Sequence, residues 1–445
     1  MTGYWAGHAW LPDGVAADVR LVERDGRWAS VQPGLAAEPG DTVLPGLVLP
    51  GLANTHSHAF HRALRGRTHD GGGTFWTWRE RMYALAARLE PDSYLALARA
   101  VYAEMALAGV TVVGEFHYLH HGVGGERYAE RNAFGHALIQ AAAEAGIRIT
   151  LLDACYLAGG LVEAGPDQTE YQPLSAVQRR FSDGTPRAWA ERLETLNAPP
   201  HARVGAAIHS VRAVPDGQLA AVVRAAGSRP LHVHVSEQPA ENAVTLARFG
   251  RTPTALLAAA GFGGPGHTAV HATHLDERDI AFYGRTRTNV SFCPTTERDL
   301  ADGIGPARAL ADAGAVLTLG SDQNATVDLL EEARALESHE RLVSLQRGRF
   351  APGELVRALT VAGHASLGWD DAGRLAPGDR ADLVAIRLDT VRTAGAAPGQ
   401  APLAATAADV DTVLVDGRPI VRDGRHVLGD VGRLLAEAIE PLYAG

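Results

Sequence analysis

The chain has 445 residues, of which 46% are hydrophobic and 21% charged, the composition of a soluble globular protein long enough to bury a large core. Its 41 basic and 51 acidic residues give a formal net charge of −10, which argues against nucleic acid or an anionic membrane as a partner. All 41 basic residues are arginine, as codon usage in a G+C-rich genome favours, so a Schiff-base lysine, a phosphate-loop lysine and a lysine carbamate bridging two metals are excluded.

The first 46 residues are expected to form short antiparallel strands, because their apolar side chains are punctuated by glycine and proline. Residues 1–20 lack a cationic segment followed by an apolar one, and no uncharged apolar stretch of about 18 residues occurs elsewhere. We therefore expect a cytoplasmic protein that does not enter a membrane. Cys155 and Cys293 lie far apart and predict neither a disulfide framework nor a thiolate zinc site.

Eight short apolar, β-branched runs follow, as expected for parallel strands buried on both faces. The runs are Leu47–His58, Val110–Phe116, Arg148–Tyr156, Arg203–Val211, Pro230–Glu237, Thr268–His274, Thr286–Pro294 and Ala315–Asp322. Segments with helical periodicity lie between them, including Pro91–Ala108, Ala133–Ala145, Gln218–Ala226 and Ala240–Ala260. Eight strand-then-helix units predict an α/β fold, a (β/α)8 barrel over residues 47–372.

From residue 373 the pattern returns to short strands, with a turn expected at Asp416-Gly417. We expect residues 373–445, which include a terminal helix, to join residues 1–46 in one small β-sandwich domain beside the barrel. The glycine run Gly71–Gly73 predicts a loop after the first barrel strand, either a mobile lid over an active site or a plain surface loop.

Polar residues collect where the predicted barrel strands end, which is where barrel enzymes place their catalytic side chains. The first strand ends in His56-Ser57-His58, and strand alternation puts both imidazoles on one face. The later strands end in further candidates, namely His209, Arg212, His232, His234, Glu237, His271, His274 and Asp322. A single histidine in such a run is more often a core residue than a ligand, but the combination predicts a metal site.

Three neutral imidazoles and one carboxylate suit Zn²⁺, with Fe²⁺ as the alternative, and a water would complete the site. Without a lysine to carbamylate, one metal ion is expected rather than two. The pKa of its bound water would fall towards about 7, which yields a hydroxide nucleophile at neutral pH. Asp322 can accept the proton of that water, Glu237 can act as general acid and base, and His271 can polarise the electrophile or orient the hydroxide.

Several motifs resemble the formimidoylglutamate deiminase family of the amidohydrolase superfamily, and the resemblance covers essentially the whole chain. The motifs are Phe75-Trp-Thr-Trp-Arg79, Glu115-Phe-His-Tyr118, His232-Val-His-Val-Ser-Glu237, Val270-His-Ala-Thr-His274 and Cys293-Pro-Thr-Thr-Glu297. The first two are the more specific, since many deaminases share the metal motifs. The resemblance implies a homodimer and one zinc ion per subunit, with the ligands His56, His58, His234 and Asp322 and the catalytic residues Glu237, His271 and Asp322.

The same resemblance implies hydrolysis of N-formimino-L-glutamate to N-formyl-L-glutamate and ammonia, a step of histidine degradation. Hydroxide would attack the formimino carbon while Glu237 shuttles a proton to the leaving nitrogen. The substrate carries two carboxylates, and Arg79 and Arg212 stand at the family's carboxylate-binding positions, where a guanidinium can bind a carboxylate bidentately. Tyr118 and His209 match the positions that assist them, each with a packing role as the alternative.

Two positions depart from the family pattern. His61 stands where relatives carry glutamine, so the paired donor and acceptor of an amide are lost from this substrate-binding position. Asn324 stands where serine or histidine is commoner. Both departures concern the orientation of the substrate and leave the metal site untouched.

Two other functions remain open. A related aminohydrolase would act on a ring amine such as guanine or cytosine, and the two arginines would then serve another purpose. A catalytically silent metal-binding or scaffold protein would retain Glu237 and His271 without using them. His117, His120 and His121 indicate either a second metal site or a histidine-rich loop near the rim of the first.

Overall fold

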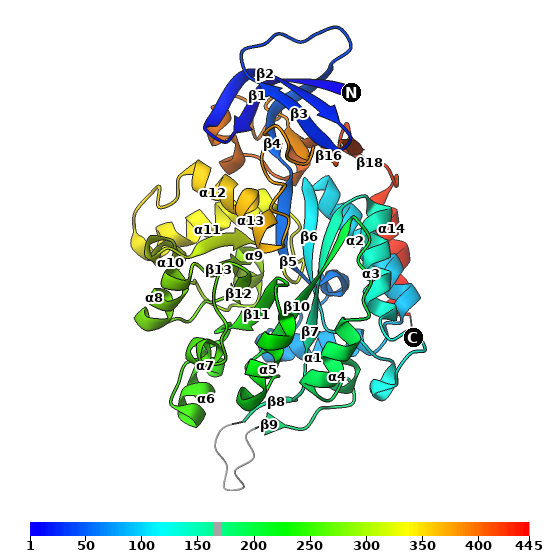
Figure 1. The fold of residues 1–445 in the computed structure, drawn as a ribbon, viewed down its shortest axis with the longest axis vertical. Coiled ribbons are helices and arrows are strands. Elements are labelled where there is room, and N and C mark those ends of the chain that lie inside the picture. Colours follow the sequence, from blue (N-terminus) through cyan, green and yellow to red (C-terminus); the bar gives the residue numbers. More distant parts are fainter. Residues whose placement is uncertain (163–170, 445) are drawn as a thin grey trace.

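The computed structural model describes residues 1–162 and 171–444, which form a barrel and a smaller β domain (Figure 1). The barrel strands are β5 Leu52–Ser57, β6 Val110–His117, β7 Arg148–Cys155, β10 Ala202–Ser210, β11 Leu231–Val235, β12 His267–His271, β13 Asn289–Phe292 and β14 Val316–Leu319. Each pairs in parallel with the next. The barrel closes where backbone N–H groups of Ser321 and Asp322 donate to the carbonyl of His56 at 3.1 and 2.9 Å. The predicted (β/α)8 barrel is confirmed.

Helices cover the outside of the barrel and the rim of its open end. They are α1 Phe75–Ala86, α2 Pro91–Leu107, α3 Ala133–Ala145, α4 Pro186–Leu193, α5 Asp216–Ala226, α6 Pro239–Phe249, α7 Pro253–Ala259, α8 Glu277–Thr286, α9 Pro294–Asp299, α10 Ala307–Ala313, α11 Leu329–Ser344, α12 Pro352–Leu359 and α13 Val361–Ser366. Two short antiparallel strands of two residues each, β8 Gly160–Leu161 and β9 Tyr171–Gln172, lie at the same end. None of the described helices is both long and apolar enough to cross a bilayer.

The segment with helical periodicity over Ala240–Ala260 forms two helices, α6 and α7. Gly250 ends α6 in the left-handed conformation, with φ 62°. Thr252 then caps α7 by accepting a hydrogen bond from the N–H of Ala255, and Pro253 occupies its first turn.

Both chain ends contribute to the small domain, as predicted. Its strands are β1 Thr2–Leu11, β2 Gly14–Arg24, β3 Arg27–Gln32, β4 Thr42–Pro50, β15 Leu383–Ile386, β16 Val410–Val415, β17 Arg418–Arg422 and β18 Arg425–His426. They form one continuous sheet, joined where β4 pairs antiparallel with β15, around an apolar cluster of their own. The turn predicted at Asp416-Gly417 connects β16 to β17, with positive φ at both residues.

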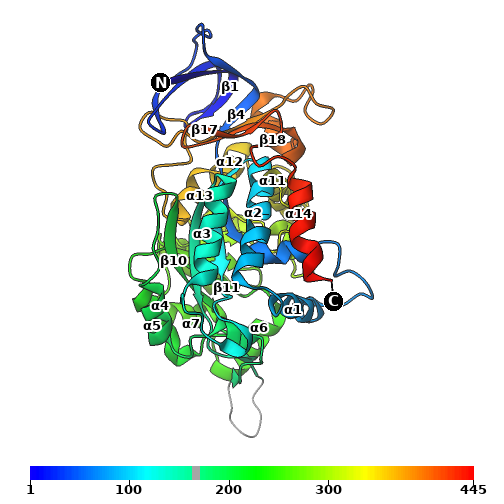
Figure 2. The same cartoon turned by 90° about the vertical axis from the view of Figure 1, so that its right-hand side faces the viewer.

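The barrel begins later than the predicted boundary after residue 46. The run Leu47–His58 is two strands, since β4 ends at Pro50 in the small sheet and β5 starts at Leu52 in the barrel. Gly51 separates them, and a Cβ atom there would lie only 2.4 Å from the methyl carbon of Thr111. The terminal helix α14, Val431–Ile439, packs against α2 of the barrel rather than on the small sheet (Figure 2).

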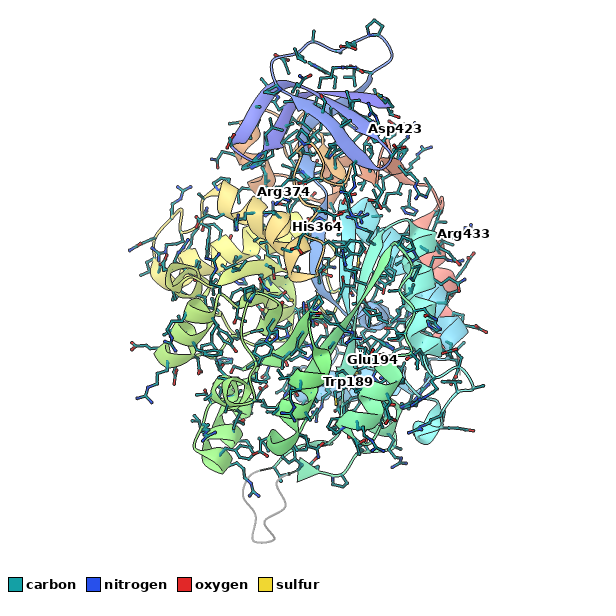
Figure 3. The ribbon with its side chains drawn as sticks, in the orientation of Figure 1. Trp189, Glu194, His364, Arg374, Asp423 and Arg433 are labelled. Carbon is teal, nitrogen blue, oxygen red and sulfur yellow. The ribbon has the colours of Figure 1, made fainter. Side chains whose placement is uncertain are left out.

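A buried arginine ties the small domain to the barrel. Arg148, the first residue of β7, is ion-paired with Asp382 beside β15 and, at 3.1 Å, with Asp416 of the β16–β17 turn. The imidazole of His364, labelled in Figure 3, lies at the same junction and contacts the carbonyl of Gly51 at 3.0 Å. Burial alone would raise the pKa of Asp382, but the Arg148 guanidinium outweighs burial and holds that pKa below its ordinary value.

We expect Asp382→Asn to lower the free energy of unfolding by about 3–5 kcal/mol, because it leaves the buried charge of Arg148 without its main partner. Urea denaturation followed by circular dichroism measures this change. Glu437→Gln is the matched control, since it removes the exposed ion pair between Glu437 and Arg433, labelled in Figure 3, and should change stability little. Equal effects of the two substitutions would contradict a structural role for the Arg148–Asp382 pair.

Candidate active site

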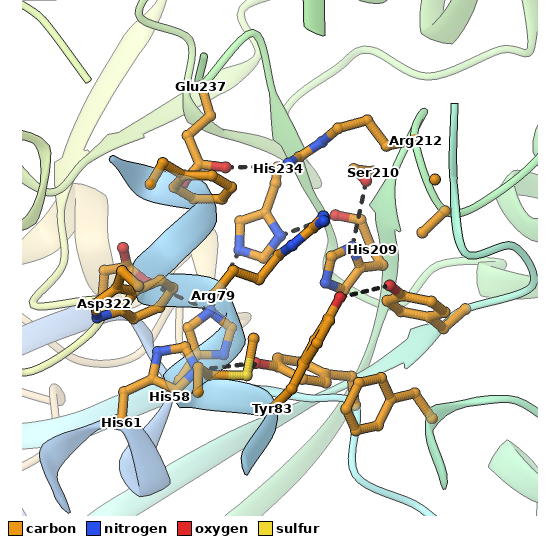
Figure 4. A pocket seen from close by; sticks show the side chains of 18 of the residues that line it. His58, His61, Arg79, Tyr83, His209, Ser210, Arg212, His234, Glu237 and Asp322 are labelled. Atoms are coloured by element: carbon orange, nitrogen blue, oxygen red, sulfur yellow. Dashed lines mark hydrogen bonds and ion pairs between the residues drawn. The ribbon is translucent and has the colours of Figure 1, made fainter. Parts of the chain in front are cut away.

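The predicted site residues meet at the C-terminal ends of the barrel strands, at the end of the barrel opposite the small sheet. One pocket there is lined by ten of the eleven, namely His58, His61, Arg79, Tyr118, His209, Arg212, His234, Glu237, His271 and Asp322 (Figure 4). The eleventh, His56, is fully buried behind them. The glycine run Gly71–Gly73 precedes α1 and does not line this pocket, and its role as a lid stays a prediction.

Three imidazole nitrogens and one carboxylate oxygen lie at close range in the pocket floor. The Nε2 atom of His234 is 3.1 Å from that of His56 and 3.3 Å from that of His58. Asp322 Oδ1 is 3.3 Å from the Nε2 atom of His56 and 3.4 Å from that of His58. Ligand atoms about 2.1 Å from one ion and roughly 95–110° apart would be about 3.1–3.4 Å from each other, so these four contacts fit a single zinc ion. His234 and Asp322 each contact His56 and His58 but not each other.

The ligand nitrogens are neutral and correctly oriented. Nδ1 of His58 donates to the carbonyl of Phe116, and Nδ1 of His234 to that of His209, each at 2.9 Å. These bonds leave the Nε2 lone pairs facing the cluster. Burial, reinforced by the neighbouring imidazoles, lowers the pKa of His58 to about 3 and holds those of His56 and His234 well below the ordinary value.

The backbone is strained where it aims these side chains. Ser236, His271, Ala272 and Asp322 all have φ between 42° and 68°, a left-handed region that side-chain-bearing residues rarely occupy. Each such residue costs roughly 1–3 kcal/mol unless its surroundings impose the conformation. Hydrogen bonds between strand ends do so here, including the 2.9 Å bond from the N–H of His58 to the carbonyl of Asp322.

Glu237 and His271 face the cluster from the ends of β11 and β12. Glu237 Oε1 lies 3.7 Å from Nε2 of His271, whose Nδ1 is 3.4 Å from Glu297 Oε1. Burial favours the neutral imidazole, but Glu237, Glu297 and Asp322 together outweigh burial and raise the pKa of His271 to about 10. The His271 ring thus lies between carboxylates, with Glu237 and Asp322 facing its Nε2 atom and Glu297 its Nδ1 atom.

The two predicted arginines differ in their surroundings. Arg79, on α1, stacks its guanidinium 4.5 Å above the ring of Trp76, and no described carboxylate lies within ion-pair distance of it. Arg212 donates from Nη2 to Oε2 of Glu237 at 2.9 Å and pairs through Nε with Oε2 of Glu241 at 3.1 Å. Sequence reasoning missed Glu241, because an acidic residue in the first turn of a helix ordinarily serves as a cap.

The remaining predicted residues complete the pocket wall. The Tyr118 hydroxyl contacts Nε2 of His61 at 2.9 Å, while Nδ1 of His61 has no hydrogen-bond partner in the described part of the chain. Nδ1 of His209 contacts the hydroxyl of Ser210 at 3.3 Å. Asn324 does not line the pocket; its amide donates to the carbonyl of His58 at 3.1 Å and ties β14 to β5.

The second histidine cluster is a buried ion network. His117, His120 and Asp153 have ligand atoms within 4.8 Å of one another. However, Arg192 binds both oxygens of Asp153, at 2.7 and 2.8 Å, and the indole of Trp189 (Figure 3) donates to the same carboxylate at 2.9 Å. A guanidinium already neutralises this carboxylate, which favours the loop interpretation over a second metal site.

Comparison with known proteins shows the family to which the chain belongs. Residues 47–420 match the amidohydrolase family. The chain belongs to the amidohydrolase family. Residues 1–43 match the N-terminal domain of formimidoylglutamate deiminase HutF. The chain is 38% identical to formimidoylglutamate deiminase of Pseudomonas aeruginosa, covering 96% of both chains, and 30% identical to 8-oxoguanine deaminase of that organism, covering 97% of this chain and 95% of the other.

The predicted resemblance to formimidoylglutamate deiminases is thereby confirmed, and the protein is a hydrolase of C–N bonds. Among solved structures, an amidohydrolase from Brucella melitensis is 31% identical with a TM-score of 0.92 and full coverage of both chains. An adenosine deaminase from Xanthomonas campestris with bound zinc, 24% identical with a TM-score of 0.82 over 98% of this chain and 96% of that one, shares the fold.

We expect His58→Ala and His234→Ala to lose most of the bound metal, while Glu237→Gln keeps it, because only the first two remove atoms of the nitrogen and oxygen cluster. Metal analysis of the purified proteins checks this. Loss of metal from Glu237→Gln would make that carboxylate a ligand instead.

Since the pKa of His58 is lowered to about 3, metal binding by the wild type should also persist at about pH 5, where an ordinary histidine is protonated.

Proposed function

We propose that the protein hydrolyses N-formimino-L-glutamate to N-formyl-L-glutamate and ammonia, as a step of histidine degradation. One observation carries the proposal: the cluster of imidazoles and carboxylates shares its pocket with two arginines, Arg79 and Arg212. A linear amidine bearing two carboxylates needs both features, whereas a ring amine needs no pair of cations. The 38% identity to a formimidoylglutamate deiminase supports the same substrate.

One zinc ion would be held by His56, His58, His234 and Asp322. When bound, it supplies an activated water at neutral pH. Glu237, whose Oε1 faces the cluster, would take one proton from the attacking water and deliver it to the formimino nitrogen. The second proton of the water, lost from the newly added hydroxyl, would reach the same nitrogen, which then leaves as ammonia while the formyl C=O forms. Asp322 reaches the same region through Oδ2, 3.8 Å from Nε2 of His271, and assists the proton transfer.

His271 orients the reacting groups. Its Nε2 atom lies 3.7 Å from Glu237 and 3.8 Å from Asp322, so the ring would donate a hydrogen bond to the oxygen that adds to the formimino carbon. Glu297 holds the opposite edge of the ring at Nδ1. The imidazole is thus fixed between the proton-carrying carboxylates.

The carboxylates of the substrate would bind at the two arginines of the pocket wall, one of which contacts Glu237. Arg79 has no described acidic partner to displace, and its stacking on Trp76 holds the guanidinium in place. Arg212 provides the second cation. The Tyr118 hydroxyl, His209 and the free Nδ1 of His61 can add hydrogen bonds to the bound substrate.

A second candidate is a ring-amine aminohydrolase, favoured by the 30% identity to 8-oxoguanine deaminase. Arg79 disfavours it, because a neutral heterocycle cannot compensate the charge of an arginine that has no described acidic partner in a confined pocket. The choice of zinc over iron, the homodimer and the cytoplasmic location remain predictions.

We expect ammonia release from N-formimino-L-glutamate, slower release from N-formimino-L-aspartate, and none from guanine or cytosine. The shorter substrate brings its carboxylates one methylene closer together, so it cannot satisfy both arginines and the reacting carbon at once. A coupled glutamate dehydrogenase assay measures the ammonia. Activity confined to a ring amine would overturn the proposal, and no release from any compound would favour a catalytically silent protein.

We expect Arg79→Met and Arg212→Met each to lower kcat/KM about 10- to 150-fold and to raise KM, because each removes a charge-assisted contact of roughly 1.5–3 kcal/mol. Arg81→Met is the matched control, since Arg81 lies on the same helix as Arg79 but is exposed and donates to the carbonyl of Arg67. Unchanged kinetics in both pocket variants would refute carboxylate binding by these arginines.

A further inference from the structure

Arg212 is shared by two buried carboxylates with different surroundings. Its Nη2 atom holds Oε2 of Glu237 at 2.9 Å, and its Nε atom lies 3.1 Å from Oε2 of Glu241 (Figure 4 shows the first contact). The side chain of Glu241 is fully buried, that of Glu237 is 7% exposed, and that of Arg212 is 12% exposed. Two neighbouring nitrogens on one edge of the guanidinium therefore hold two different carboxylates, one fully buried and one facing the pocket.

Glu241 is fixed in place from both sides. Its Oε1 atom accepts a hydrogen bond from the N–H of Ser236 at 3.1 Å, and its backbone belongs to α6. Ser236 has a φ of 51° and immediately precedes Glu237. Glu241 thus holds both the strained turn that carries Glu237 and the arginine that binds it.

The contact with Arg212 restricts the movement of the Glu237 carboxylate that its proposed role in proton transfer requires. Its Oε2 atom is engaged by Arg212, while Oε1 faces Nε2 of His271 at 3.7 Å. A carboxylate that carries a proton between two atoms must turn between them, and a charge-assisted hydrogen bond to a guanidinium opposes that movement. The free enzyme therefore holds its proton carrier in a restrained position.

We propose that a carboxylate of the substrate replaces Glu237 at Arg212, and that Glu241 is the positioning residue that keeps the guanidinium in place during the exchange. The replacement conserves the number of ion pairs on Arg212, and the released Glu237 carboxylate keeps the His271 imidazole as its neighbour, at 3.7 Å. It releases Glu237 for proton transfer only when a carboxylate-bearing substrate is present. This inference rests on the proposed function in one respect, that the substrate is an amidine with carboxylates.

A ligand that cannot react tests the exchange directly. We expect a crystal structure of the zinc-loaded enzyme with glutarate, a dicarboxylate without a formimino group, to show a glutarate oxygen on Arg212, Glu237 beyond hydrogen-bonding distance of it, and Glu241 still paired with Nε. Glu237 remaining on Arg212 beside bound glutarate, or a pocket that takes up no glutarate, would overturn the exchange. This result does not depend on which amidine the enzyme hydrolyses.

Kinetics separate exchange from simple binding. N-formimino-4-aminobutyrate lacks the α-carboxylate and N-formimino-norvaline lacks the side-chain carboxylate, so one of them lacks the group that Arg212 binds. We expect that analogue to show a lower kcat as well as a higher KM than the full substrate, and the kcat difference to vanish in Arg212→Met, where Glu237 is no longer restrained. A change in KM alone would indicate binding without exchange.

Glu241→Gln tests the positioning role. The amide keeps an oxygen for the N–H of Ser236 but removes the charge that holds Arg212, so we expect kcat/KM for the full substrate to fall about 10- to 100-fold with zinc content unchanged. The analogue that cannot reach Arg212 should be affected much less. An equal loss for both substrates would indicate a merely structural role.

Glu337→Gln is the matched control, because Glu337 is also buried, also pairs with an arginine Nε, of Arg341 at 2.8 Å, and also accepts a backbone N–H, from Phe350 at 2.7 Å, but lies outside the pocket. Its kinetics should match the wild type.

Absence of turnover of N-formimino-L-glutamate by the wild type would refute the proposed function, and the glutarate structure would still decide the exchange.

Discussion

Three imidazole nitrogens and a carboxylate oxygen, linked by four contacts of 3.1–3.4 Å, are the constraint on which the rest of the site depends. Such a cluster of lone pairs is unfavourable unless a cation binds among them, and burial keeps the imidazoles neutral enough to bind one. Its members come from the first, fifth and eighth barrel strands, so barrel closure creates the site. The strained turns at Ser236, His271 and Asp322 are local consequences of aiming these side chains inward.

The order of the strands, the barrel and the pocket residues could be predicted because their signals are local. Apolar runs mark buried parallel strands, and a histidine or carboxylate after such a run stands at the open end of a barrel whatever its partners are. The alternation in His56-Ser57-His58 already places two imidazoles on one face. Seven of the ten residues named at strand ends line one pocket, and His56 is buried beside it. The other two, His232 and His274, contact backbone carbonyl groups of Ser366 and Asp302 instead.

What could not be predicted depends on partners far away in the chain. The run Leu47–His58 is apolar throughout, and only the close approach of Thr111 at Gly51 shows why it divides into a strand of each domain. Glu241 resembles an ordinary helix cap until Arg212, twenty-nine residues earlier, is placed beside it. Asn324 sits among pocket residues in sequence, but its amide joins two strand ends instead of facing the substrate.

The absence of lysine has a consequence for this pocket beyond the chemistry it excludes. A guanidinium is planar and carries its donors at fixed positions, so Arg212 can pair with Glu241 through Nε and with Glu237 through the neighbouring Nη2 at once. An ammonium group is a single point of charge on a flexible stem, and it could not hold one carboxylate rigidly while exchanging another. A compositional bias with a genomic explanation thus leaves, at this one position, the side chain whose geometry permits a shared carboxylate site.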